Sequence, residues 1–133
     1  MADPPSTPPA STPRRVVIVE DSPDSREMLR YLLEQAGHEV HEAADGPGGV
    51  EAILSIAPHV ALVDLGLPGL DGYEVARRVR ADAAGRAVQL VAMTGYGQPE
   101  DVRRAEGAGF DAHLVKPVDP AHVTALIRER PTA

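Results

Sequence analysis

The stretch Val16-Val17-Ile18-Val19-Glu20-Asp21-Ser22-Pro23 joins an apolar run to two acids and then to a helix start. Its first four residues are β-branched and apolar, which is typical of a buried strand. Serine is a favoured helix N-cap, and proline is favoured at the first helical position. The stretch therefore predicts a buried strand with two carboxylates at its carboxyl end, followed directly by a helix.

The same alternation of apolar runs and helical segments continues along the chain. Further strand-length runs lie at 60–63, 88–93 and 112–115, with a weaker one at 38–41. Helices are predicted between and after them, beginning at Pro23, Pro47, Asp71, residue 99 and Pro120. The order is βαβαβαβαβα, which predicts a parallel sheet covered by helices on both faces and joined by right-handed crossovers.

Two predictions concern helix faces. In the first helix, apolar residues recur at three- and four-residue spacing and indicate the buried face: Met28, Leu29, Leu32, Leu33 and Ala36. The densest basic cluster is Arg77, Arg78 and Arg80, which we interpret as a solvated helix face.

Composition limits the class of protein. The chain has 133 residues, 43% hydrophobic and 25% charged, as expected for one globular domain. We expect a Pro-rich tail or linker at 1–13 and the domain at 14–130. A net charge of −7 argues against nucleic acid as a partner. With no cysteine, no signal sequence and no apolar run near the length of a membrane span, we expect a cytoplasmic protein.

Charged residues follow three of the predicted strands. Glu20 and Asp21 follow the first, Asp64 follows the run at 60–63, and Lys116, the only lysine, follows the last. In open parallel sheets, ligands bind at the carboxyl ends of the strands. Three carboxylates in one crevice repel each other, and a hard cation such as Mg²⁺ relieves the repulsion. With the Thr94 hydroxyl and the Lys116 ammonium, the set indicates a phosphoryl-accepting aspartate.

These residues, with Gly66-Leu67-Pro68-Gly69 after Asp64, Thr94-Gly95 and Lys116-Pro117, resemble the receiver domain of two-component response regulators over 14–130. The resemblance implies a flavodoxin-like (βα)5 fold with sheet order 2-1-3-4-5. It implies Asp64 as phosphoacceptor, with Thr94 and Lys116 on the phosphoryl oxygens. The Mg²⁺ ligands it implies are Asp21, Asp64, the backbone carbonyl of Gly66 and, mainly through water, Glu20.

The resemblance also implies partners. A histidine kinase or histidine phosphotransfer protein would donate the phosphoryl group, and the domain would catalyse only its own phosphotransfer and autodephosphorylation. We expect no output module after the last predicted helix, and we therefore expect output by protein contact. A free single-domain regulator and the receiver of a hybrid histidine kinase both fit. We expect a monomer or a weak, phosphorylation-dependent dimer.

Two departures from the family pattern concern the conformational switch and the lifetime of the phosphorylated state. Many receivers carry Tyr or Phe three residues before the lysine, where this chain has His113. His113 is either a tolerated surface residue or the switch partner of Thr94. Histidine changes charge between pH 5 and 8, so a switching imidazole would make coupling depend on pH. By the same resemblance, Gly66 and Tyr96 occupy the positions that border the attacking water in this family, and they predict slow autodephosphorylation.

Two alternatives remain open. One is a degenerate receiver that serves as a scaffold without phosphorylation. The other is a phosphatase of the haloacid dehalogenase type, which also uses Asp, Thr or Ser, Lys and Mg²⁺. That phosphatase needs an acid/base aspartate two residues after the nucleophile, where this chain has Gly66.

Overall fold

Strands and helices alternate throughout the computed structural model, which describes residues 14–95 and 98–129. All five predicted strands and all five predicted helices are present, within two residues of the expected bounds at most ends. The predicted tail at 1–13 lies outside the described residues. The elements are β1 (Arg15–Val19), α1 (Pro23–Gln35), β2 (Glu39–Ala43), α2 (Gly46–Ile56), β3 (Val60–Asp64), α3 (Gly72–Ala81), the 3₁₀ helix η2 (Ala83–Gly85), β4 (Gln89–Thr94), α4 (Pro99–Ala108), β5 (Ala112–Val115) and α5 (Pro120–Glu129).

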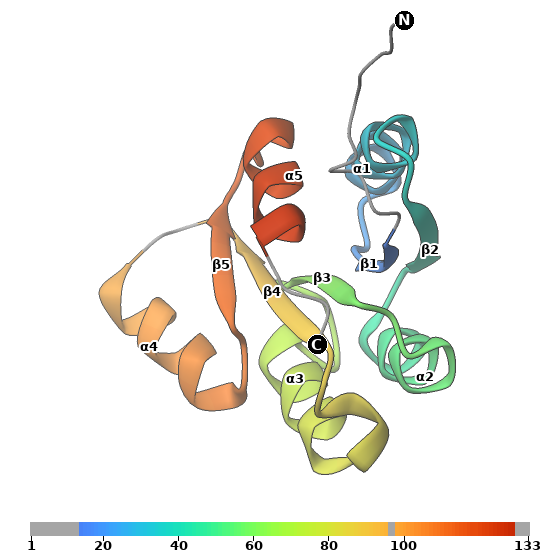
Figure 1. Ribbon diagram of the computed structural model, residues 1–133. Helices are drawn as coiled ribbons and strands as arrows, with labels where there is room; N and C mark the ends of the chain where they lie inside the picture. The colour runs from blue at the N-terminus through green and yellow to red at the C-terminus, as the bar shows by residue number, and fades with distance from the viewer. Residues whose placement is uncertain (1–13, 96–97, 130–133) are drawn as a thin grey trace, which may run out of the picture.

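The five strands form one parallel sheet in the order β2-β1-β3-β4-β5, which confirms the predicted flavodoxin-like fold. Figure 1 shows the strands side by side in that order, with α1 and α5 on one face and α2, α3 and α4 on the other. The chain order reverses at β1 and β3, so the carboxyl ends of these two strands border the crevice where doubly wound folds bind ligands.

The core consists of two aliphatic layers, one on each face of the sheet. In β1, Val16 and Ile18 pack into the layer under α1 and α5, while Val17 and Val19 pack into the layer under α2 and α3. All four are 0% exposed. This alternation follows from the two-residue period of a strand that is buried on both faces.

Side chains cap α1 and α3, the helices that follow the carboxyl ends of β1 and β3. The Oγ of Ser22 accepts the N–H of Ser25 at 3.4 Å, and Asp71 Oδ1 accepts the N–H of Glu74 at 3.0 Å. Both caps were predicted. They fix the first turns of α1 and α3, and so fix how the chain leaves β1 and the loop after β3.

The predicted face of α1 is partly wrong. Leu29 and Leu33 are buried as expected, but Met28 is 55% exposed. The stripe of apolar residues is wider than the strip of helix that contacts the sheet. Met28 lies at the margin of that strip, facing the carboxyl end of the sheet.

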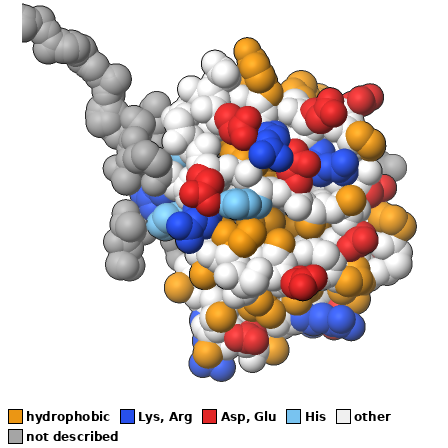
Figure 2. Space-filling model, turned by 90° about the vertical axis from the view of Figure 1, so that its right-hand side faces the viewer, with side chains coloured by type: hydrophobic (Ala, Val, Ile, Leu, Met, Phe, Trp, Pro, Cys, Tyr) orange, Lys and Arg blue, Asp and Glu red, His pale blue; other side chains and the backbone are white. Residues whose placement is uncertain are grey.

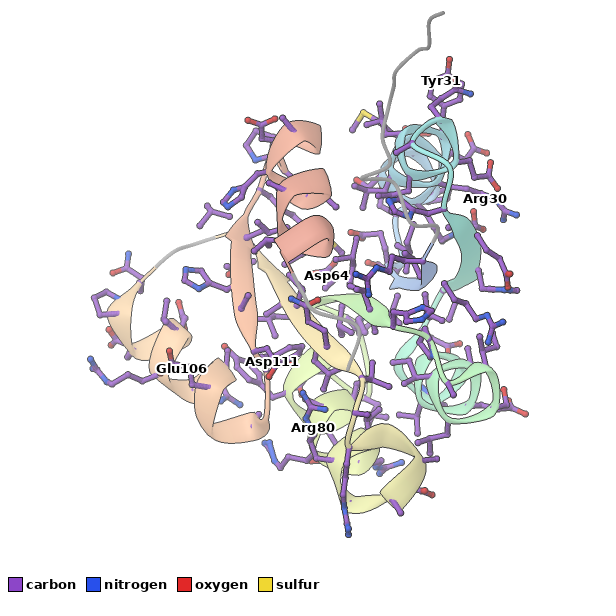
Figure 3. All side chains as sticks on the ribbon, viewed as in Figure 1. Arg30, Tyr31, Asp64, Arg80, Glu106 and Asp111 are labelled. Atoms are coloured by element: carbon purple, nitrogen blue, oxygen red, sulfur yellow. The ribbon has the colours of Figure 1, made fainter. Side chains whose placement is uncertain are left out.

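The prediction for the arginine cluster is wrong at Arg80. The side chains of Arg77 and Arg78 are 47% and 55% exposed, as expected, but that of Arg80 is only 22% exposed. The Arg80 guanidinium donates to the Gly109 carbonyl at 2.9 Å and to Asp111 Oδ2 at 2.8 Å (Figure 3). It also donates to three carbonyls of the segment that follows α3, those of Gly85, Arg86 and Val88. Arg80 therefore joins the end of α3 to the loop between α4 and β5.

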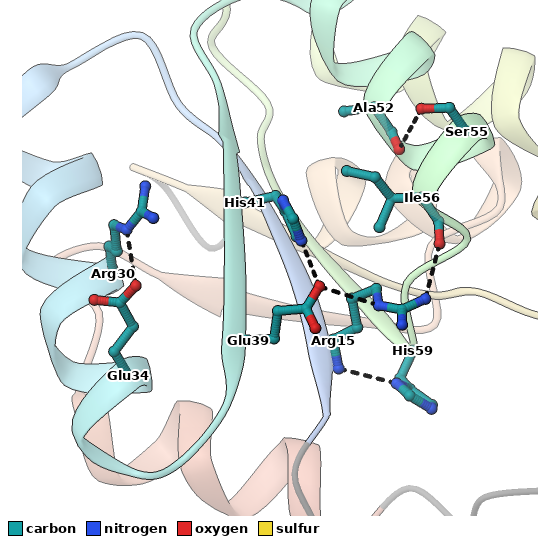
Figure 4. A network of polar contacts seen from close by, with 9 residues as sticks. All are labelled: Arg15, Arg30, Glu34, Glu39, His41, Ala52, Ser55, Ile56 and His59. Atoms are coloured by element: carbon teal, nitrogen blue, oxygen red, sulfur yellow. Dashed lines mark hydrogen bonds and ion pairs between the residues drawn. The ribbon is translucent and has the colours of Figure 1, made fainter.

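The edge strand β2 presents charged and histidine side chains to solvent. Figure 2 shows acidic, basic and histidine side chains interspersed on this face. Glu39 Oε2 lies 3.2 Å from Arg15 Nε and 2.6 Å from His41 Nε2 (Figure 4). Charge on an edge strand discourages pairing with another chain. Within the described residues, none of the helices has the length and apolar character that a membrane span requires.

Candidate functional site

Backbone hydrogen bonds of the sheet extend to the predicted site residues. The N–H of Glu20 donates to Ala43 at 3.1 Å, which continues the pairing of β1 with β2. The N–H of Lys116 donates to the carbonyl of Thr94 at 2.7 Å, which continues the pairing of β4 with β5. The site residues are therefore placed by the rigid ladder of the sheet, although they lie at the strand ends or just beyond.

Three carboxylates meet at this edge. Glu20, Asp21 and Asp64 each offer an oxygen, and these oxygens lie within 4.8 Å of one another. Glu20 and Asp64 are 1% and 6% exposed, whereas Asp21 is exposed to solvent. Mg²⁺ binds one or two carboxylates and completes its coordination with waters and phosphate oxygens. A trio with two buried members and one member open to solvent fits such an ion.

Lys116 bridges two of the carboxylates. Its Nζ lies 3.0 Å from Asp64 Oδ2 and 3.1 Å from Glu20 Oε1. Burial disfavours the ammonium, but hydrogen bonds to Asp64 and Glu20 outweigh burial, so the pKa of Lys116 is above its ordinary value. The side chain remains charged at neutral pH and 32% exposed, so it is accessible to an incoming anion. The Lys116–Pro117 peptide bond is cis.

Glu20 is the most buried of the acids. Burial raises its pKa above the ordinary value, and hydrogen bonds from the Ser22 N–H and from Lys116 oppose the rise. The Ser22 N–H donates to Glu20 Oε2 at 3.1 Å, while Lys116 contacts Oε1. Both carboxylate oxygens thus have a donor, and the side chain is held in one orientation.

Asp64 is fixed by its neighbours in the same way. Its Oδ1 accepts the N–H of Gly66 at 2.9 Å, while its Oδ2 faces Lys116. A Cβ on Gly72 would lie 2.6 Å from the Asp64 carbonyl oxygen, so the start of α3 packs directly on the backbone of the aspartate. Gly66 itself is exposed, and only Asp64 Oδ1, at 3.6 Å, lies near the position its Cβ would take. Because position 66 has no side chain, that position adds no cover over Asp64 Oδ1.

The remaining predicted residues lie along β4 and β5. Thr94 is 7% exposed at the end of β4, and its carbonyl accepts the Lys116 N–H. His113 is exposed on β5 and borders a small hollow between α4 and β5. Tyr96, which the sequence suggests as a shield for the phosphoryl group, lies outside the described residues.

A shallow pocket that the sequence did not suggest adjoins the site. It holds about 120 Å³ and lies between α1 and the loop that follows β5. Met28 and Leu29 line it from α1, Pro117 and Val118 line it from the loop, and Lys116 lies at its polar end. No periodicity marks this pocket, because its lining also includes Glu20 and Met93 and so comes from segments far apart in the chain.

Comparison with known proteins agrees with this geometry. The family model described as "Response regulator receiver domain" matches residues 16–128, and the chain belongs to that family. The Protein PilH of Pseudomonas aeruginosa is 35% identical over 105 residues, covering 79% of this chain and 87% of that protein. The receiver domain of a sensor histidine kinase from Pseudomonas aeruginosa, solved with a magnesium ion coordinated in its active site cleft, has a TM-score of 0.81. It is 29% identical, and the match covers 88% of this chain and 96% of that one.

Relatives of very different length share the domain. The Gliding motility regulatory protein of Myxococcus xanthus is 36% identical over 116 residues, which cover 87% of this chain but only 15% of that protein. Other curated relatives are about twice as long as the matched region, such as a DNA-binding response regulator of Mycolicibacterium smegmatis, of which 50% is covered. The domain itself is a signalling domain of two-component systems.

Proposed function

We propose that the chain accepts a phosphoryl group on Asp64 and relays a signal by changing shape. The observation that supports this most is the setting of Asp64. Its Oδ2 lies 3.0 Å from the Lys116 ammonium, and its carboxylate shares one crevice with Glu20 and Asp21. A buried nucleophilic carboxylate beside a cation and a pair of further acids has the composition of a phosphoryl-accepting site.

In this proposal, each side chain around Asp64 has a separate role. Lys116 keeps its proton because of the two carboxylates, and it leaves Asp64 to pair with the incoming phosphoryl oxygens. Thr94, at the end of the neighbouring strand, offers a hydroxyl to the same oxygens. Asp21, Glu20, Asp64 and the Gly66 carbonyl would hold Mg²⁺, which supplies neutralisation of the charge on the transferring group.

A protein donor fits the surroundings of the site. The pocket beside Lys116 is walled mainly by apolar side chains, and Met28 and Tyr31 of α1 are 55% and 62% exposed. Apolar groups at the rim of a phosphoryl site give no help to a small phosphate donor but suit a helix or loop of a protein. The proposed donor is a phosphohistidine of a kinase or phosphotransfer protein.

The proposed output element is α4. Ala105 and Ala108 are its only buried side chains, and Arg104 stacks on the ring of Tyr73 in α3 at 3.9 Å. Small buried side chains give little packing energy, so α4 is an element that a modest free energy can shift. His113 lies on β5 next to this helix, where a switch residue that responds to Thr94 would act.

The test is intact-mass measurement after incubation with a small acyl phosphate, with and without Mg²⁺. We expect one phosphoryl adduct that depends on Mg²⁺ and is lost in Asp64→Asn. The matched control is Asp82→Asn, which removes an exposed carboxylate beyond the far end of α3. The proposal is wrong if the adduct persists in Asp64→Asn, or if the wild type forms none under any condition; the latter favours the scaffold alternative.

A further inference from the structure

We infer that Arg26 is a positioning residue of the acidic site, which holds the peptide between Glu20 and Asp21 and so directs the Asp21 carboxylate. The inference rests on the proposed function, because it concerns how the site is kept ready for its cation. Arg26 does not touch any of the three carboxylates of the trio. It acts through the backbone.

The guanidinium of Arg26 contacts two groups. Its Nη1 donates to the carbonyl oxygen of Glu20 at 2.8 Å, and its Nε lies 3.4 Å from Glu42 Oε1 on β2. The side chains of Arg26 and Glu42 are 19% and 26% exposed. Glu42 also pairs with Arg30, whose Nη1 lies 3.1 Å from its second oxygen. Figure 3 shows Arg30 on α1 beside the β2 edge. The carboxylate of Glu42 thus holds two arginines one helical turn apart, and only Arg26 reaches the site.

The Asp21 side chain depends on its backbone for its orientation. In the described part of the chain, its side chain takes part in no hydrogen bond or ion pair. Glu20 and Ser22, on either side, are both fixed. The Glu20 N–H donates to Ala43, and Ser22 accepts the Arg26 N–H at 3.0 Å as the cap of α1.

The peptide plane between Glu20 and Asp21 is rigid, so its one carbonyl contact sets its rotation. The direction of the Asp21 side chain follows from that rotation. A ligand carboxylate that is exposed and unpaired needs such support, because outer groups that orient a ligand commonly control metal affinity.

Simple electrostatics predicts the opposite effect of losing Arg26. Its positive charge lies against the backbone of Glu20, a member of the acidic trio, and opposes the binding of a divalent cation. Removal of the charge alone would therefore tighten Mg²⁺ binding. Removal of the backbone contact would weaken it. The sign of the change separates a positioning role from a bystander role.

The experiment is an NMR titration of the full chain with Mg²⁺, following backbone amides at the carboxyl ends of β1 and β3. Arg26→Met is compared with the wild type and with Arg30→Met. Arg30 lies on the same helix and also pairs with Glu42, so its substitution removes an equal charge but no contact with Glu20. We expect Arg26→Met to weaken Mg²⁺ binding about tenfold. Arg30→Met should bind within twofold of the wild type or more tightly.

Two further variants keep the result interpretable. Arg26→Lys retains the charge and an N–H donor and should recover part of the affinity. Glu42→Gln leaves the contact of Arg26 with Glu20 and should bind nearly as the wild type does. Thermal unfolding without Mg²⁺ checks that each variant is folded, and the affinity is compared only between folded variants; if Arg26→Met does not fold, Arg26→Lys carries the comparison, with a two- to fivefold loss expected.

The outcomes separate the inference from the proposed function. If folded variants of Arg26 bind Mg²⁺ as tightly as the wild type or more tightly, the positioning role is wrong and the proposed function stands. If the wild type itself binds no Mg²⁺ and forms no adduct on Asp64, both are wrong.

Discussion

The Lys116 ammonium reaches from the end of β5 across the end of β4 to Asp64 on β3, with its Nζ 3.0 Å from Asp64 Oδ2. The same nitrogen lies 3.1 Å from Glu20, which follows β1. The Lys116 side chain therefore connects the carboxyl ends of β5, β3 and β1. Because Glu20 is almost fully buried, the lysine also offsets the charge that its burial penalises.

Loss of the Lys116 ammonium should affect both the transfer of a phosphoryl group to Asp64 and the ionisation of Glu20. In Lys116→Met, we expect phosphorylation of Asp64 by a small acyl phosphate to slow about a hundredfold, the usual effect of removing a group that stabilises transition-state charge. The pKa of Glu20 should rise further, because the hydrogen bond from Lys116 that lowers it is gone. Time-resolved intact mass measures the first effect, and carboxyl NMR shifts measure the second. A rate within threefold of the wild type would exclude a role for Lys116 in transfer.

Arg80 should be the most important arginine for stability. Arg80→Ala removes a charged donor from four carbonyls and from Asp111, whose Oδ2 also accepts the Leu90 N–H at 2.9 Å. Hydrogen bonds of charged groups are worth more than neutral ones, so we expect a loss of about 2–3 kcal/mol in the free energy of unfolding. Urea denaturation measures it.

The control for Arg80 is Arg78→Ala, two residues earlier on the same helix. Its side chain is 55% exposed and pairs only with Glu74. Exposed pairs contribute little, so the change should stay within about 0.5 kcal/mol. Equal losses in the two variants would contradict a special role for Arg80.

The contrast between these two arginines shows where sequence reasoning stops. Strand runs and helix caps are local patterns, so β1, its acids and the Asp71 cap could be predicted from neighbouring residues. Arg80 differs from Arg78 only in what surrounds it, and its partners Gly109 and Asp111 lie 29 and 31 residues away. Likewise, Arg26 looks like any arginine on a helix surface until the fold places it against the Glu20 carbonyl.

Stability should fall in acid through His59. Its Nδ1 accepts the N–H of Arg15 at 2.9 Å (Figure 4), so the imidazole must be unprotonated at that atom. Partial desolvation lowers the pKa of His59 below its ordinary 6.5, and the charges of Arg14 and Arg15 lower it further. The folded state thus binds fewer protons than the unfolded state. The contribution of His59 is fully present above pH 6.5 and is lost as pH falls below that value toward the folded pKa.

Urea denaturation between pH 5 and pH 8 measures this dependence. His59→Gln should flatten the fall in the free energy of unfolding below pH 6.5. His122→Gln, which removes an exposed histidine of α5, should leave the slope unchanged. An unaltered slope in His59→Gln would mean that other groups carry the acid sensitivity.

His113 provides the test of how phosphorylation would reach α4. It is exposed on β5 and borders a hollow whose opposite wall is formed by Val102, Ala105 and Glu106 of α4. If the imidazole is the switch partner of Thr94, His113→Tyr should change the amide shifts that phosphorylation induces in α4 and β5. Recording them at pH 6 and pH 8 tests whether the switch depends on pH, and only proteins that retain His113 should differ between the two. His41→Gln, on the opposite edge strand, is the control. Identical phosphorylation-induced shifts in His113→Tyr and the wild type at both pH values would mean that His113 is a surface residue without a role in switching. The contact of α4 with Tyr73 would then be the remaining route from Asp64 to that helix.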